Sequence, residues 1–249
     1  MNSTISILSR GARLGSLVLA VFTGLTVTAL AVPTEAWAAP TTTRSVSGYQ
    51  AVALEGPMTV KVSLADQESV TVEGEAKATA AVDTTVVSRD GTPTLLVKPS
   101  STGTRGLGDV VVHVRGPQFN ALSLSGSGDV EAQLSNQPAL KLSLAGSGDV
   151  KVKGLTTHQL DLSLAGSGDV RVQGAAQKLA VSLAGSGDVW LDDLSAEEAQ
   201  VRVAGSGDVQ VRVQQRLKVS IAGSGDVRVS GPVKDISSTV VGSGRLIRP

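Results

Sequence analysis

Polar and apolar residues alternate along most of this chain, and short glycine-rich segments interrupt the alternation. In Asp149-Val-Lys-Val152 and Asp169-Val-Arg-Val172, the second and fourth positions are apolar and the first and third are polar. The same period of two precedes the glycines, as in Leu142-Ser-Leu144. This period is typical of half-buried β-strands, and no segment sustains the 3.6-residue period of a helix. The pattern therefore predicts an all-β protein.

The glycine-rich segment recurs as Gly-Ser-Gly-Asp at nearly constant spacing. Its first glycine occupies positions 126, 146, 166, 185, 205 and 223, so successive copies lie 18 to 20 residues apart. A degenerate copy runs from Gly106 to Val110, and Gly242-Ser-Gly-Arg245 follows the last full copy. A unit of this size cannot bury its apolar face alone, so stacked copies are expected to share one core.

These features predict a single-stranded parallel β-helix, a solenoid with one repeat of about 20 residues in each coil. Coils separated by the inter-strand distance of about 4.8 Å would place the eight corners along a rod of about 34 Å. Aliphatic columns would fill its interior, one of them running through Val130, Val150 and Val170. A β-prism and an antiparallel meander of hairpins are the alternatives, although a meander would not be expected to repeat every corner so strictly.

The first 38 residues have the pattern of a secretory signal peptide. Arg10 and Arg13 precede an apolar run over residues 14–32, and Ala36-Trp-Ala38 supplies a small-x-small cleavage site. A transmembrane anchor is the alternative, because the run is nearly long enough to span a bilayer. We predict cleavage after Ala38 and an exported protein that is periplasmic, on the cell surface or secreted, with no membrane span after signal removal.

Two regions are expected after the signal peptide. Residues 39–105 lack the repeat period and contain irregular strand patterns, so they are predicted to form an N-terminal β cap that opens the solenoid. Residues 106–249 are predicted to form the repeat solenoid itself. At its far end, Arg245 replaces the repeated aspartate and Arg248-Pro249 follows, and charge and proline both blunt an edge strand.

Charge and composition exclude several kinds of binding site and partner. The whole chain has a formal net charge of +0, and no basic patch of the kind that nucleic acid requires is visible in the sequence. The absence of cysteine excludes disulfides and thiolate metal sites. The predicted mature chain keeps three aromatic residues, Tyr49, Phe119 and Trp190, so Val, Leu and Ala must supply the core.

The chain resembles the head GIN domain family, whose members are described as auto-transporter adhesins. The resemblance rests on the opening Arg44-Ser-Val-Ser-Gly-Tyr-Gln-Ala-Val52 and on the reiterated Ser-Gly-Ser-Gly-Asp-Val, and it covers roughly residues 44–246. It implies an exported, β-helix-like domain and supplies no catalytic residues. We expect no C-terminal translocator barrel in this sequence, so the auto-transporter part of the description is not expected to apply.

The repeated corner has a structural interpretation and a metal-binding one. Glycine permits tight bends, and aspartate accepts hydrogen bonds from backbone N–H groups at turns. The aspartates of successive corners, including Asp109 of the degenerate copy, are expected to form an outward ladder. Carboxylates about 4.8 Å apart repel by roughly 0.9 kcal/mol per pair in water, and Lys151, Arg171 and Arg228 are expected to offset this. The structural interpretation is preferred, and no metal or other cofactor is assigned. The alternative is a calcium-binding ladder, in which carboxylate oxygens face the ion, of Asp129, Asp149, Asp169, Asp188, Asp208 and Asp226. An alanine before the glycines is expected to fit the inside of the corner.

An enzyme is the less favoured alternative. A catalytic groove on a β-helix would interrupt the repeat with clustered carboxylates and bases, as in glycan-cleaving enzymes. The interruptions available are His113, His158, Trp190, Asp192-Asp193 and Glu197-Glu198. Of these, His113, His158 and Asp192-Asp193 are better interpreted as surface and loop residues, and Trp190 alone offers an aromatic platform for a sugar. No nucleophile elbow, metalloprotease motif or P-loop is present. We therefore expect a non-enzymatic adhesin-like or scaffold protein that binds an envelope protein or glycan and does not bind nucleic acid.

Overall fold

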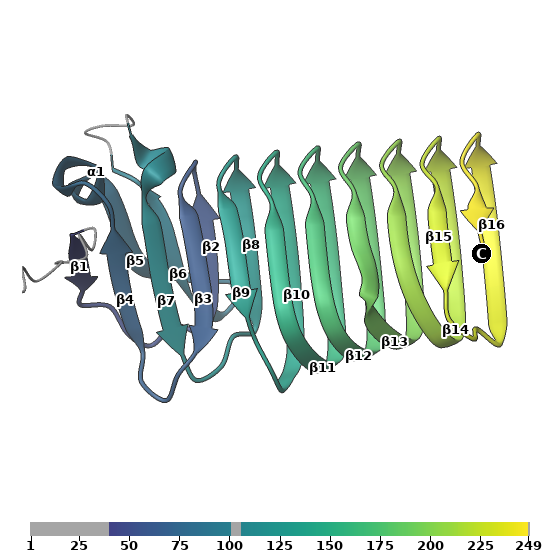
Figure 1. Ribbon diagram of the computed structural model, residues 1–249, viewed down its shortest axis with the longest axis horizontal. Coiled ribbons are helices and arrows are strands. Elements are labelled where there is room, and N and C mark those ends of the chain that lie inside the picture. The colour runs from purple at the N-terminus through teal and green to yellow at the C-terminus, as the bar shows by residue number, and fades with distance from the viewer. Residues whose placement is uncertain (1–39, 101–105, 249) are drawn as a thin grey trace, which may run out of the picture. The chain divides into compact units, whose positions relative to one another are not determined.

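The computed structural model describes residues 40–100 and 106–248, and these residues fold almost entirely into β-strands (Figure 1). The predicted signal peptide lies outside the described residues. Within the described ranges, no helix has both the length and the apolar character needed to cross a bilayer.

The strands follow one another along the chain with short connections. In order they are β1 (Thr41–Arg44), β2 (Ala51–Glu55), β3 (Thr59–Leu64), β4 (Ser69–Glu73), β5 (Val82–Arg89), β6 (Thr92–Pro99), β7 (Val111–Gly116), β8 (Ala121–Gly126), β9 (Asp129–Gln133), β10 (Gln137–Gly146), β11 (Val150–Gly166), β12 (Val170–Gly185), β13 (Val189–Gly205), β14 (Val209–Gly223), β15 (Val227–Ser230), β16 (Asp235–Gly242) and β17 (Leu246–Ile247). A short helix, α1 (Ala76–Ala80), and a 3-10 helix, η1 (Leu107–Asp109), complete the set of described elements.

The predicted parallel β-solenoid is confirmed. Each long strand from β11 to β14 pairs in parallel with its successor, and the register matches equivalent positions of consecutive repeats, as in Val150 with Val170 and Leu164 with Leu183. Figure 1 shows these strands stacked as successive coils, with the glycine corners aligned along one edge. The aliphatic columns fill the interior, where Val150, Leu164 and Val170 are at most 3% exposed.

Part of the region expected to cap the solenoid lies inside it. Strand β2 pairs in parallel with both β6 and β8, and β3 pairs in parallel with both β7 and β9. Residues 51–64 therefore form a coil between the β6–β7 coil and the β8–β9 coil. Beyond these coils the pairing becomes antiparallel, with β4 on β7, β1 on β4 and β5 on β6. Helix α1, which the sequence pattern did not predict, lies at this end (Figure 1).

Close stacking of the corners explains their glycines. Gly146 has a φ of 138°, and a side chain on either Gly146 or Gly148 would collide with the backbone of the preceding corner. The backbone oxygen of Gly126 accepts hydrogen bonds from the N–H groups of Ser147 and Gly148, at 3.0 and 3.3 Å. The prediction that the alanine before the glycines lies on the inside of the corner is wrong. Strand alternation turns it outward because the aliphatic residue before it faces the core, and all five are exposed: Ala145, Ala165, Ala184, Ala204 and Ala222.

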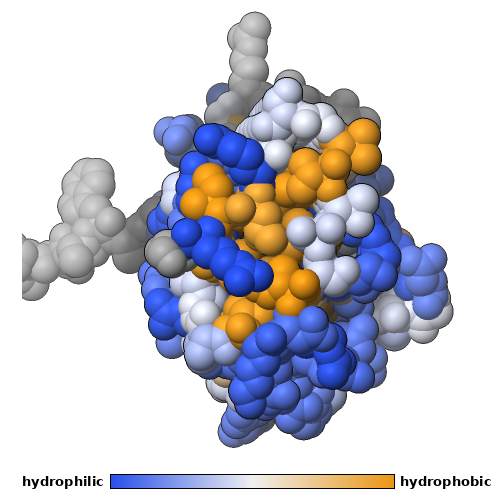
Figure 2. Space-filling view, turned by 90° about the vertical axis from the view of Figure 1, so that its right-hand side faces the viewer, coloured by the Kyte–Doolittle hydropathy of each residue, from blue (hydrophilic) through white to orange (hydrophobic). Residues whose placement is uncertain are grey.

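The C-terminal end of the solenoid presents apolar side chains to solvent. Figure 2 shows this end, where apolar residues lie among hydrophilic ones. Val240 and Val241 of β16 are 41% and 68% exposed, and Ile236 and Leu246 are partly buried against the core. Ser238 occupies the core-facing position that Val219 occupies in the preceding coil. The last coil therefore has a partly polar inner face.

Candidate functional site

The aspartate ladder is a continuous hydrogen-bonded column. In each full copy, one carboxylate oxygen accepts the backbone N–H of the equivalent residue in the next coil. Asp129 Oδ1 accepts the N–H of Asp149 at 3.1 Å, and Asp188 Oδ1 accepts the N–H of Asp208 at 2.9 Å. The column continues through all six aspartates and ends where Asp226 Oδ1 accepts the N–H of Arg245 at 3.0 Å. Each carboxylate thus satisfies a donor that the tight corner leaves without another partner.

Cations contact the second carboxylate oxygen in three coils. Lys151 Nζ lies 3.8 Å from Asp149 Oδ2, Arg228 donates to Asp208 Oδ2 at 2.8 Å, and Arg245 donates to Asp226 Oδ2 at 2.7 Å. The hydrogen bond and positive charge of Arg245 lower the pKa of Asp226, and the two carboxylates raise the pKa of Arg228 and of Arg245. Arg245, which replaces the aspartate in the last copy of the repeat, therefore ends the ladder with a positive charge.

Two details of the expected ladder are corrected. Asp109 does not belong to it, because Asp109 lies in η1 while Thr59 and Val111 occupy the register positions preceding Asp129. Arg171 stacks on the next coil rather than pairing with Asp169, since its guanidinium lies 5.2 Å from the centre of the Trp190 ring. Arg228 contacts Asp208 in the preceding coil more closely than Asp226 in its own, at 2.8 against 4.0 Å.

This geometry supports the structural interpretation of the aspartates. One oxygen of each is already held by a backbone N–H group, and a calcium ion would need six to eight oxygen ligands. Among residues 40–100 and 106–248, no group of three or more acidic or histidine side chains is placed to hold a metal ion. Calcium binding by the ladder stays a prediction that titration would test.

The residues considered for catalysis are spread over the molecule. His113 Nε2 lies 2.8 Å from Glu73 Oε2 near the N-terminal end of the front sheet, which contains β7, β3, β9 and the first half of β11. Asp193 accepts a hydrogen bond from Gln173 at 3.1 Å and is exposed, as is Asp192. His158 and Glu197 do share one groove, described next.

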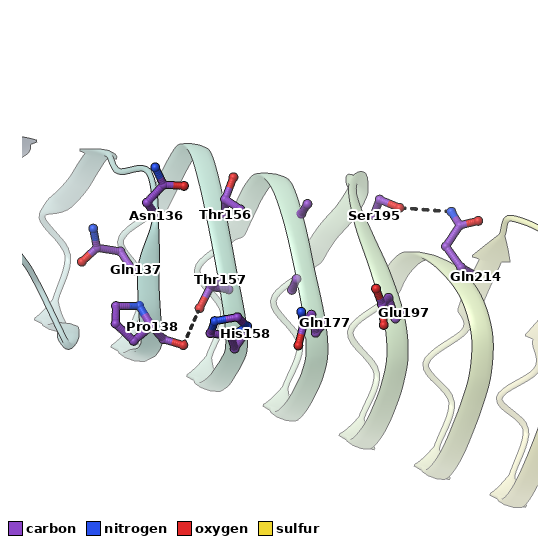
Figure 3. A pocket seen from close by; sticks show the side chains of 12 residues that line it. Asn136, Gln137, Pro138, Thr156, Thr157, His158, Gln177, Ser195, Glu197 and Gln214 are labelled. Atoms are coloured by element: carbon purple, nitrogen blue, oxygen red, sulfur yellow. Dashed lines mark hydrogen bonds between the residues drawn. The ribbon is translucent and has the colours of Figure 1, made fainter.

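The turn groove runs across the solenoid opposite the glycine corners. It has a volume of about 500 Å³ and follows five coils, from Asn136 in the turn before β10 to Gln214 in β14. Figure 3 shows its side chains in a row along the coils. The exposed Ala175 lies at the middle of the row, where small side chains leave the surface hollow. The lining is Asn136, Gln137, Pro138, Thr156, Thr157, His158, Ala175, Ala176, Gln177, Ser195, Glu197 and Gln214.

Hydrogen bonds fix part of this lining and leave the rest available. The Gln214 amide donates to Ser195 Oγ at 3.1 Å, and Thr157 donates to a backbone oxygen, either that of Gln159 at 3.0 Å or that of Pro138 at 3.3 Å. The described residues supply no such partner to the side chains of Asn136, Thr156, His158, Gln177 and Glu197, all of which are exposed. The groove therefore offers amide, hydroxyl and imidazole groups and one carboxylate between methyl and methylene surfaces.

A second hollow, the basic groove, lies on the front sheet near the N-terminal end. Its volume is about 280 Å³, and four cationic side chains line it: Lys61, Arg115, Lys151 and Lys153. Strands β3, β7 and β11 contribute them, and β9 lies between β3 and β11. The linear sequence conceals this cluster because its members are up to 92 residues apart.

The fold, with the turn groove and the basic groove, defines a parallel β-solenoid with polar surface hollows. A family model described as "Putative auto-transporter adhesin, head GIN domain" matches residues 48–232. The chain belongs to this family, as the repeated corner indicated. No curated protein is significantly similar to it.

Solved structures share the fold. A crystal structure of a "putative adhesin" from Bacteroides fragilis NCTC 9343 is 20% identical with a TM-score of 0.75, covering 84% of this chain and 96% of the other. A "putative lipid binding protein" from Parabacteroides distasonis ATCC 8503 is 22% identical with a TM-score of 0.65, covering 86% and 98%. A "putative adhesin" from Parabacteroides merdae ATCC 43184 is 18% identical with a TM-score of 0.62, covering 86% and 97%.

Proposed function

We propose that this protein is an exported, non-enzymatic, adhesin-like binding protein of the cell envelope that holds a glycan along its turn groove. The observation that carries the proposal is the length and chemistry of that groove. It crosses five coils and offers amide and hydroxyl groups beside methyl surfaces. Sugars present hydroxyl groups on their edges and C–H groups on their faces, so this mixture of surfaces suits an extended glycan.

The repeated architecture supports the same role. A solenoid presents similar groups at regular intervals, which suits a long ligand with repeated units. The groove contains no aromatic platform, so each contact is expected to be weak and the total affinity to depend on several contacts made together. Membership of a family described as adhesins agrees with binding rather than turnover.

Retention on insoluble envelope glycan would test the proposal. The chain without residues 1–38 is incubated with purified glycan, and the retained fraction is measured by sedimentation against glycan concentration. Replacing Asn136 by Gly, which suits its φ of 48°, and Gln177 by Ala removes two unpartnered amides and should weaken retention several-fold. Gln118→Ala, an exposed amide outside the groove, is the matched control and should bind as the wild type does.

The outcomes separate the alternatives. Equal retention of all three proteins would place binding elsewhere, and no retention on any glycan would refute the proposal. Release of new reducing ends during the same incubation would instead show a glycan-cleaving enzyme. Export is tested separately by N-terminal sequencing of the protein recovered from envelope fractions, where Ala39 is the expected first residue.

A further inference from the structure

The charge of the basic groove is unusual for this protein. The chain as a whole has a formal net charge of +0, whereas the residues that line the groove have a net charge of +3, from four cations and one carboxylate, Glu131. A groove on the back sheet, which contains the second halves of β11 to β14, provides the contrast. There Lys178, Arg216 and Lys218 lie among Asp161 and Glu198, so the local charge is only +1.

Two of the four cations already have weak partners. Lys61 Nζ lies 3.8 Å from Glu131 Oε2, and Lys151 Nζ lies 3.8 Å from Asp149 Oδ2. These side chains are 40 to 49% exposed, and such surface pairs add little to stability. Arg115 and Lys153 are exposed and form no ion pair with any described residue. Arg115 and Lys153 are therefore two cations of the groove that take part in no ion pair among the described residues.

The register sets the spacing of these charges. Ser63 lies beside Arg115 on one side and Gln133 on the other, and Gln133 lies beside Lys153. Arg115 and Lys153 are thus three strands apart, about 14 Å, with a hydroxyl and an amide between them. Such a row suits a linear ligand that has an anionic group at intervals and hydroxyl groups between.

The basic groove also adjoins the turn groove along the chain. Lys153 precedes Thr156 by three residues in β11, and Gln133 precedes Asn136 by the same number. We propose that the basic groove binds the anionic groups of an acidic glycan, with Arg115 and Lys153 as the principal contacts. This inference rests on the proposed glycan-binding function and names the class of glycan.

A glycan fits the groove better than an anionic membrane does. The apolar residues that line it, Val62 and Ala132, are 2% and 5% exposed, so they offer nothing to insert among lipid chains. The accessible groups are cations, a hydroxyl and an amide. These are the groups that recognise carboxylates and hydroxyls on a sugar polymer.

Binding to polygalacturonate, with neutral dextran as the comparison, tests the inference on the chain without residues 1–38. The wild type should bind polygalacturonate more tightly than dextran, and rising sodium chloride should weaken only the former. Replacing both Arg115 and Lys153 by Gln should weaken polygalacturonate binding about tenfold, because each exposed charge contact contributes about threefold. Dextran binding should not change. The matched control replaces Lys178 and Lys218 by Gln, which removes the same charge from the back sheet.

Each other outcome has a definite meaning. Equal losses in the test and control variants would show general charge attraction and overturn the inference. Retention by phosphatidylglycerol vesicles but not by polygalacturonate would also overturn it, in favour of a membrane partner. Dextran or envelope-glycan binding through the turn groove, without any preference for the acidic polymer, would refute this inference while leaving the proposed function standing.

Discussion

Two corners of the solenoid have the same backbone path but different sequences. In the repeat region the corner is Gly146-Ser-Gly148, and in the coil inserted near the N-terminus it is Gly56-Pro-Met58. The first position needs glycine in both, with φ of 138° and 124°. At the third position, where the repeat has its second glycine, Met58 is fully buried, whereas a side chain on Gly148 would collide with Gly128.

The difference shows why the third position of the repeat corner requires a glycine. A side chain at this position points toward the preceding coil in the stack. Before Gly148 lies an identical tight corner, whereas the described residues before Met58 include η1 and Val110, whose backbone oxygen accepts the N–H of Thr59 at 3.0 Å. Close stacking on a like corner, rather than the bend itself, therefore requires Gly148 and its equivalents.

Substitution of the second glycine should give the largest effect. In Gly168→Ala the new methyl group would meet the backbone oxygen of Gly148, so the two coils must separate. We expect a loss of about 3 kcal/mol in the free energy of unfolding, measured with urea, because backbone atoms rather than a flexible side chain must move. Gly108→Ala is the control. It has open space around it and should change stability by less than about 0.5 kcal/mol. A similar loss in both variants would contradict the stacking argument.

High pH should affect the N-terminal coils through Tyr49. Its hydroxyl donates to the backbone oxygen of Arg115 at 2.5 Å, and its ring stacks on Phe119 with centroids 6.4 Å apart. Burial, with a smaller effect from Glu68, raises the pKa of Tyr49 to about 12. A raised pKa means that the neutral phenol stabilises the fold fully below pH 10, and that this contribution falls as pH rises from 10 toward 12.

Comparison with Tyr49→Phe isolates that contribution. The wild type should lose up to about 2 kcal/mol of stability between pH 9 and pH 12 beyond any loss in Tyr49→Phe, as the shift in the Tyr49 pKa requires. Urea unfolding at each pH measures the difference. Parallel pH profiles for the two proteins would show that the Tyr49 hydroxyl does not titrate with folding.

Substitution of an aspartate in the ladder should have a smaller effect on stability. Two variants of the same residue separate the contribution of its hydrogen bond from that of its charge. Asp169→Ala removes the acceptor that Asp188 N–H uses at 3.0 Å, which should cost about 1 kcal/mol. Asp169→Asn keeps an acceptor oxygen and removes one charge from the column, so it should be neutral or slightly stabilising. Hydrogen exchange at the Asp188 amide should accelerate only in the alanine variant. Equal exchange in both variants would contradict the role of the carboxylate oxygen.

Calcium separates the two interpretations of the same ladder. If the aspartates serve only the fold, millimolar calcium should leave the melting temperature unchanged in the wild type and in Asp169→Asn. A rise in the wild type that Asp169→Asn reduces would instead establish calcium binding by the column, since a ligand of the native state raises its stability.

The comparison of the two regions also explains what could be predicted. The geometry of the repeat region could be predicted from the sequence. Alternation indicates which strand face is buried, the spacing indicates the length of one coil, and Gly-Ser-Gly indicates the corner. The coil over residues 51–64 contains no Gly-Ser-Gly corner and lies outside the repeat spacing. Its position between the β6–β7 coil and the β8–β9 coil could therefore not be predicted from the order of segments along the chain. The turn groove was missed because its lining is the variable part of each repeat. The basic groove was missed because β-pairing, not sequence proximity, brings Arg115 beside Ser63 and Gln133 beside Lys153.

The smallest expected effect lies at the C-terminal end of the ladder, at acid pH. The hydrogen bond and charge of Arg245 lower the pKa of Asp226 below its ordinary value of 3.8. A lowered pKa means that the ionised carboxylate stabilises the fold above about pH 4, and that this contribution is lost as pH falls through the lowered value. Arg245→Gln should therefore be less stable than the wild type at pH 6, with the difference shrinking below pH 4. Melting temperatures across this range measure it, and Arg248→Gln, which removes a nearby charge outside the ladder, should follow the wild type. A constant difference between Arg245→Gln and the wild type at every pH would show that Arg245 acts by packing alone, and that the ladder ends without the help of opposite charge.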